Sequence, residues 1–454
     1  MTLPDPDSAS RREFTKAAVA LGGTAGLSAC LGYGDDSDGA ETNGSGTNGS
    51  GTNGAADDGL PGVPTGDPEA LPGRQHAWNE FLSTDEDGNV ATPVHHVLRY
   101  ADLTVDVTDE GALADARETL SGALADLEAA FEWSNEGLLF TVGYAPAYFD
   151  RFDEDLPDEV DLPDPTALTS LEDPSFDEAD VLVHLASDAP EAVLAVEEAL
   201  FGDETTANGV DVTDASDLFE RVDRRTGFLD AGLPREKRAD AAGVPDDAPI
   251  PEGAPLFMGF RNGFAASQAT EDRVSIADGP FSDGTTQHVS KLRTQLNAWW
   301  NQENHRQRVA KMFSPTHADE ERVGEWGERL GADPAVADLP EDAVEFAREE
   351  GVVGHAQKAA RAREDGEPIL LRRDFPTTDD DHTGLHFVSL QESVADFVRV
   401  REAMTGEDIT DDTGVGARVN NGILQYVFVR RRGNYLVPPR AHRSLPIPDP
   451  STDD

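Results

Sequence analysis

The chain has 454 residues, enough for two compact halves or one large domain, since a domain usually has ~100–200 residues. Acidic residues outnumber basic residues by 89 to 36, and the formal net charge of -53 would repel nucleic acid and anionic lipid headgroups. The single cysteine, Cys30, excludes an intramolecular disulfide and any zinc or iron–sulfur site that needs several thiolates.

The acidic residues are spread along the chain rather than confined to a tail. Together with few lysines and many small apolar residues, they are typical of proteins from salt-loving archaea. At molar salt the Debye length is ~3 Å, so the self-repulsion of such a surface is largely screened. The net negative charge therefore indicates a salt-rich habitat and says little about catalysis, which must be inferred from particular residues.

Residues 1–30 predict an export signal. Arg11 and Arg12 lie in a twin-arginine pattern, and the apolar stretch that follows is shorter than the ~20 residues that span a bilayer. It ends in Leu-Ser-Ala before Cys30, which resembles a lipobox whose cysteine is lipidated. We expect export of the folded protein by the twin-arginine route and a lipid anchor on the extracellular face of the cell membrane. An uncleaved N-terminal anchor is the alternative, and it places the protein on the same side.

The rest of the chain divides by composition. Residues 31–75 contain a Gly/Ser/Thr/Asn repeat and Asp but little apolar content, which predicts a flexible linker. We expect a first folded half over residues 76–245 and a second half over residues 246–445. Residues 446–454 are expected to form an acidic tail.

The first half predicts four strands and two helices. Strands are expected at 94–100, 138–144, 181–186 and near 218–222, with a helix over 113–131 and a second beginning at Pro190. The acidic, proline-rich residues 152–174 are expected to form an inserted loop.

The second half repeats this rhythm. Strands are expected at 285–292, 384–390 and 423–429, with helices over 294–311 and 394–404. Two halves of this kind predict an α+β fold of duplicated ferredoxin-like βαββαβ units, in which antiparallel sheets are backed by helices.

Six segments carry a family resemblance. They are Leu139–Pro146, Gly259–Gly263, Gly354–His355, Ile369–Phe375, Gly384–Gln391 and Gly433–Pro439. In their order and rough spacing these segments resemble the dye-decolorizing (DyP-type) haem peroxidases, of the dimeric α+β barrel superfamily. The resemblance spans residues 94–439.

This resemblance implies a b-type haem (heme b) held between two sheets on the side of the second half. His355 would be the proximal iron ligand, with its second ring nitrogen bonded to a carboxylate. Asp408, Asp411 and Asp412 are the candidates for that carboxylate, and the sequence does not choose among them. On the distal side the resemblance implies catalytic roles for Arg372, Asn262 and Asp374, with Arg372 and Gly263 also contacting the cofactor.

One position departs from the family pattern. Where the family has a distal aspartate that moves the peroxide proton, this chain has Asn262. An amide can orient peroxide but cannot act as a general acid–base, and loss of that group typically costs ~10²–10⁴-fold in rate. Asp278, Asp283 and Asp374 are candidates to replace it, and a water that relays the proton to Arg372 is another route.

The resemblance thus implies a haem peroxidase that reduces hydrogen peroxide with an unknown electron donor. A first alternative is a haem-binding or haem-iron-handling protein with little peroxidase activity, which Asn262 would favour. A second alternative is a structural or interaction module without a cofactor. The sequence predicts no oligomeric state.

Overall fold

The computed structural model describes residues 59–336 and 343–450. The expected export signal, the lipidation site Cys30 and linker residues 31–58 lie outside the described residues. Among the residues that are described, no helix combines the length and the apolar character that a membrane span requires.

The first half is a ferredoxin-like unit with the strand order β4-β6-β3-β9. Helix α2 begins after Asp109, whose carboxylate accepts from two backbone N–H groups of the first turn, and its residues Leu120, Leu124 and Leu127 are buried. Helix α4 begins with Pro190 as expected. The bounds are β3 His95–Leu103, α2 Glu110–Ala130, β4 Leu139–Tyr144, β6 Val181–Ser187, α4 Pro190–Phe201 and β9 Phe219–Phe228.

The second half repeats the same order of strands, β11-β13-β10-β14. The main bounds are β10 Thr285–Thr294, α6 Asn297–Gln302, α7 His305–Met312, α8 Pro315–Asp319, α9 Ala343–Glu350, α10 His355–Ala359, β11 Leu371–Arg372, β12 Phe375–Thr377, β13 Gly384–Gln391, α11 Val394–Thr405, α12 Glu407–Asp412 and β14 Val427–Val437. The duplicated α+β fold is therefore confirmed.

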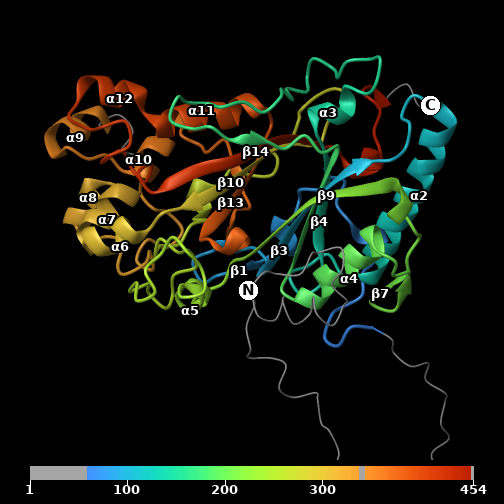
Figure 1. The fold of residues 1–454 in the computed structure, drawn as a ribbon, viewed down its shortest axis with the longest axis horizontal. Coiled ribbons are helices and arrows are strands. Elements are labelled where there is room, and N and C mark those ends of the chain that lie inside the picture. Colours follow the sequence, from blue (N-terminus) through green and yellow to red (C-terminus); the bar gives the residue numbers. More distant parts are fainter. Residues whose placement is uncertain (1–58, 337–342, 451–454) are drawn as a thin grey trace, which may run out of the picture. The chain divides into compact units, whose positions relative to one another are not determined.

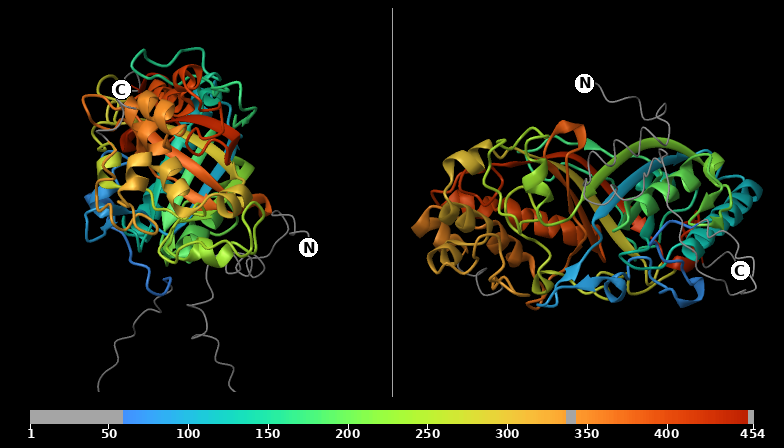
Figure 2. Two further views of the ribbon diagram at one scale, coloured as in Figure 1. Left: turned by 90° about the vertical axis from the view of Figure 1, so that its left-hand side faces the viewer. Right: turned by 90° about the horizontal axis from the view of Figure 1, so that it is seen from below.

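The strands of the two halves join into one ten-stranded sheet, because β14 pairs with β4 at Leu436 and Tyr144. Helices α2 and α4 lie at one end of this sheet and helices α6 to α10 at the other (Figures 1 and 2). The short strand β5 (Ser175–Phe176) at the end of the inserted loop adds to the same sheet by pairing with β14.

Two expected elements differ. The helix expected over 294–311 is divided into α6 and α7, because Glu303 is extended and Asn304 caps α7 with Gln307 in a capping box. The last strand lies at Val427–Val437 rather than at 423–429. The strand continues through Arg431 and Arg432, because these residues pair with the carboxylates of Asp177 and Glu172.

The ends of the folded part are longer than expected. Leu60 and Leu71, within the expected linker, pack against the apolar core of the first half. Gln75 is fully buried and bonds to the backbone of Val142. In the expected acidic tail, the carbonyl of Pro446 accepts a hydrogen bond from the hydroxyl of Tyr148. Segments of low apolar content can thus still be ordered by a few anchoring side chains.

Buried histidines occur throughout the sheet. His96 and His184 lie on neighbouring strands with their Nδ1 and Nε2 atoms 3.0 Å apart, and His96 Nε2 bonds to the carbonyl of Pro93 at 2.7 Å. Because that carbonyl only accepts, Nε2 carries the proton and Nδ1 accepts from His184. Burial lowers the pKa of His96 to about 3 and that of His184 well below its usual value.

This pair predicts a pH dependence of stability. Below pH ~6.5 the unfolded chain binds protons on histidines that stay neutral in the folded protein, so the free energy of unfolding falls as the pH falls. Each such histidine contributes a slope of about 1.4 kcal/mol per pH unit. We expect His96→Gln to reduce the slope by about this amount, measured by urea unfolding between about pH 6 and about pH 5. His305→Gln, on the exposed surface, is the control, and an unchanged slope in His96→Gln would contradict the assignment.

Candidate functional site

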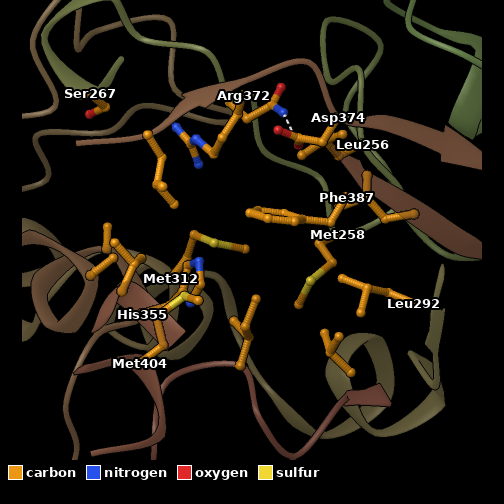
Figure 3. Close-up of a pocket in the computed structure, with 18 of the residues that line it drawn as sticks. Leu256, Met258, Ser267, Leu292, Met312, His355, Arg372, Asp374, Phe387 and Met404 are labelled. Atoms are coloured by element: carbon orange, nitrogen blue, oxygen red, sulfur yellow. Dashed lines mark hydrogen bonds between the residues drawn. The ribbon is translucent and has the colours of Figure 1, made fainter. Parts of the chain in front are cut away.

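A cavity of about 300 Å³ lies in the second half. Strands β10, β13 and β14 form one wall and helices α10 and α11 the other, so it lies between the sheet and its helices rather than between two sheets. Most lining side chains are apolar, among them Met258, Leu292, Met312, Phe387 and Met404 (Figure 3). Both the size and the apolar lining are typical of a small-molecule site.

The charged residues of the lining are mostly cationic. Five arginines contribute to it, whereas Asp374 is its only acidic residue among the described residues. This is the reverse of the balance in the whole chain, where acids outnumber bases by 89 to 36. An apolar cavity with a cationic rim suits a largely apolar ligand that carries anionic groups. The arginines are Arg261, Arg363, Arg372, Arg401 and Arg432.

Arg372 and Asp374 lie on one side of the cavity, with the Arg372 guanidinium directed into it (Figure 3). Gln268 holds Arg372 in place, since its side chain accepts from the Arg372 backbone N–H at 3.1 Å and donates to the Arg372 carbonyl at 3.1 Å. Arg372 Nε also donates to Gln268 Oε1 at 3.4 Å. The side-chain amide of Gln268, which belongs to no sequence motif, therefore fixes the position of this cation.

Asn262 and Asp374 form a hydrogen-bonded pair at this side of the cavity. Asn262 Nδ2 donates to Asp374 Oδ2 at 2.6 Å (Figure 3). Burial raises the pKa of Asp374, although the charge of Arg372 and the bond from Asn262 oppose that shift. A buried carboxyl whose pKa is raised toward the working range is a candidate for proton transfer.

His355 faces the cavity from the other side, as the first residue of α10 (Figure 3). Gly354 lets the chain pass close to Phe313, because a Cβ at Gly354 would lie 1.7 Å from the Phe313 carbonyl oxygen. Burial, then the charges of Lys358 and Arg372, lower the pKa of His355 to about 3. The imidazole is therefore neutral, which is the form that binds a metal ion.

The carboxylate partner expected for His355 is not found among the described side chains. His355 forms no hydrogen bond with them, and Asp408 pairs with Arg361 instead. Asp411 makes no bond to His355, and the side chain of Asp412 lies outside the described residues.

The charged group nearest in sequence on this side of the cavity is Lys358. It is fully buried and donates to the carbonyl of Met404 and to the carbonyl and side-chain oxygens of Asn421. Burial, then the charges of Arg401 and Arg361, lower its pKa to about 7. A buried amine thus lies near His355, where the sequence predicted a carboxylate.

Four of the predicted site residues, Asn262, His355, Arg372 and Asp374, line the same cavity. Gly263 does not line it, although its φ of +74° forms the turn that follows Asn262. Of the acids considered as replacements for the distal aspartate, Asp278 is exposed and Asp283 pairs with Arg74, so neither lines the cavity.

Sequence reasoning missed Arg401 and Arg432, which line the cavity although they follow no motif. It also missed Gln268, which bonds to Arg372, and Lys358, whose charge acts on His355. Within the described ranges, no group of three or more histidine, cysteine or carboxylate side chains could hold a metal ion. A haem iron that takes one protein ligand requires no such group.

Solved structures with a similar fold include a DyP-type peroxidase from Cellulomonas bogoriensis, 16% identical, with a TM-score of 0.51 over 84% of this chain and 96% of that one. A dye-decolorizing protein from V. cholerae is 16% identical with a TM-score of 0.45 over 80% of this chain and 97% of that one. A DypB variant from Rhodococcus jostii RHA1 in complex with haem is 14% identical with a TM-score of 0.48, over 77% and 94%.

At these identities the likeness to the Cellulomonas bogoriensis protein supports the fold and leaves the chemistry to the residues themselves. None of the curated proteins matches the sequence. One family model matches residues 93–439, which is more than half of the chain. The chain therefore belongs to the family of unknown function DUF7405.

Proposed function

We propose that this protein is a haem-dependent peroxidase of the DyP type, which reduces hydrogen peroxide with electrons from a separate donor. The observation that carries the proposal is the pairing of a neutral His355, without a hydrogen-bonding partner among the described residues, with Arg372 across one apolar cavity. The similar fold of the Cellulomonas bogoriensis peroxidase supports it.

The residues present fit a haem. The neutral imidazole of His355 offers a lone pair, and Arg432 adds two buried N–H groups, at Nε and Nη1, that donate to no described acceptor. Such orphaned cationic donors suit the carboxylates of a haem. The haem would be of the b type, because the only cysteine lies in the expected export signal and no thiol is left to attach it covalently.

Bound haem would supply the redox chemistry by which hydrogen peroxide, two electrons and two protons become two waters. The protein contributes charge and protons around it. Arg372, held by Gln268, would stabilise the negative charge that develops on the peroxide oxygen.

Asp374 would move the proton. Its buried carboxyl takes over the acid–base role that Asn262 lacks, and the bond from Asn262 Nδ2 fixes the Oδ2 atom at 2.6 Å. The amide and the carboxylate together would thus do what a distal aspartate does in the family that the sequence resembles.

Replacing the proton-transfer group tests this assignment. We expect Asp374→Asn to slow the reaction with hydrogen peroxide by ~10²–10⁴-fold, because the amide holds no transferable proton. The measurement is stopped-flow absorbance of the haem-loaded protein, with Asp278→Asn, outside the cavity, as the matched control. A variant that reacts as fast as the wild type would remove Asp374 from the mechanism.

Removing the imidazole tests the ligand. In His355→Ala we expect the Soret band to shift or disappear and to return with added imidazole, because a small ligand can enter the space left by the side chain. The control is His442→Ala, outside the cavity. A Soret band that His355→Ala leaves unchanged would show that another group binds the iron.

His355 has no carboxylate partner among the described side chains, and this favours a second candidate, a haem-binding or haem-iron-handling protein with little peroxidase activity. A carboxylate raises the basicity of a ligating imidazole, whereas Lys358 acts in the opposite direction. A wild-type protein that binds haem, reacts slowly with peroxide and passes its haem to apomyoglobin would support this candidate. A protein that stays colourless when haem is supplied would indicate the third, a module without a cofactor.

We further propose that the protein is exported by the twin-arginine route and anchored through Cys30 on the extracellular face of the membrane of a salt-loving archaeon. The support is the order of motifs in residues 1–30. We expect the double change Arg11→Lys, Arg12→Lys to abolish export, measured by fractionating cells and blotting each fraction. Export at the wild-type level would contradict this route.

A further inference from the structure

A second pocket of about 310 Å³ adjoins the cavity and shares the lining residues Arg401, Leu424, Val427 and Val429 with it. Its remaining walls come from the end of the inserted loop, from Thr405 at the end of α11, from Arg418, and from Phe428 and Arg430 at the start of β14. The inserted loop passes over α11 and β14 at this place (Figure 1). A molecule in the second pocket would therefore contact side chains that also line the first cavity.

Cationic groups predominate at this pocket. Arg401, Arg418 and Arg430 line it together with the acids Glu172 and Asp173. Glu172 is already engaged, because its buried carboxylate binds Arg401 Nη2 at 3.0 Å and Arg432 Nη2 at 2.7 Å.

The other two arginines have no carboxylate partner among the described residues. Arg418 donates only to the backbone carbonyls of Leu171, at 3.3 Å, and Val427, at 2.8 Å. Arg430 is exposed and forms no hydrogen bond or ion pair with the part of the chain that the structure describes. Because Glu172 is engaged, Asp173 is the one remaining acid of the described lining that opposes these two guanidiniums. In a chain with a net charge of -53, this local excess of positive charge leaves a site for an anion.

Apolar side chains border the same pocket. Leu171 and Phe428 line it and are 36% and 37% exposed, and Val419, next to Arg418 in sequence, is 56% exposed. The guanidinium of Arg418 stacks on the Phe428 ring, 4.4 Å from its centre. An exposed aromatic edge beside unpaired guanidiniums fits a ligand with an aromatic body and one anionic group.

We propose that the second pocket binds a small hydroxylated aromatic carboxylate, with its carboxylate on Arg418 and Arg430 and its ring against Leu171 and Phe428. That this ligand is the electron donor rests on the proposed function. Two such molecules would each lose one electron and one phenolic proton, and one hydrogen peroxide would become two waters. The binding itself does not depend on haem.

The probe is 6-hydroxy-2-naphthoate, titrated by its own fluorescence at one fixed salt concentration, since exposed charges are screened by salt. We expect saturable binding to the wild-type protein and at least a tenfold weaker affinity for Arg418→Gln. The neutral analogue 2-naphthol should bind weakly and equally to both proteins. Arg306→Gln is the matched control, because Arg306 is an exposed arginine on α7 that pairs with Asp319 outside the pocket.

Two further variants locate the probe. Met312→Trp fills the first cavity alone and should leave the affinity unchanged. Arg430→Gln removes an exposed side chain without contacts, so it should fold normally and weaken binding about threefold even if Arg418→Gln does not fold. The proposal would be overturned if the wild type and both arginine variants bound 6-hydroxy-2-naphthoate equally well. It would also be overturned if the wild type bound 2-naphthol as tightly as 6-hydroxy-2-naphthoate, or if Met312→Trp alone lost affinity. Haem binding is read separately from the Soret band, so its failure is distinguishable.

Discussion

Two buried carboxylates near the inserted loop hold the last strand in position, and the cavity depends on that strand. Glu172, 3% exposed, binds Arg401 of α11 and Arg432 of β14. Asp177, 2% exposed, binds Arg431 of β14 and Arg225 of β9, and thereby links the two halves. Removing one partner of a buried ion pair typically costs ~3–5 kcal/mol, because the other charge is left unpaired. A surface-like loop is thus part of the wall that positions α11 and β14.

These ion pairs also explain which elements the sequence could predict. Helical spacing of apolar residues identified α2, α4 and α11, whose buried residues lie mainly on one face. Short apolar runs identified the strands β3, β4, β6 and β13, of which β4 and β6 are buried at every residue. Strand β14 was displaced in the prediction because its centre carries Arg430, Arg431 and Arg432, and no local pattern indicates that acids far away in sequence will neutralise two of them. Long-range charge pairing leaves no periodic signal.

Some features of the candidate site could likewise be predicted from the sequence, and others could not. The order of the motifs placed Asn262, His355, Arg372 and Asp374 at one expected site, and all four line one cavity in the structure. It did not predict that Asn262 and Asp374 would bond to each other, because their contact joins positions 112 residues apart. Gln268 and Lys358 were missed for a similar reason: an amide and a buried lysine are common residue types, and only the fold shows that one bonds to Arg372 and the other lies in a buried network near His355.

The placement of arginines has a consequence for function in salt. At molar salt the Debye length is ~3 Å, so exposed charges act only on groups in direct contact, whereas buried charges are screened much less. Arg432, 1% exposed, keeps its attraction for an anion in the cavity under such conditions. The exposed Arg430 loses most of its electrostatic attraction for any anion that it does not contact directly. The attraction of the buried Arg432 for an anion should therefore persist as salt rises, while an anion beside the exposed Arg430 must rely on apolar contacts and on Arg418. Two neighbouring types of arginine, one buried and one exposed, thus differ in how strongly added salt weakens their attraction for an anion.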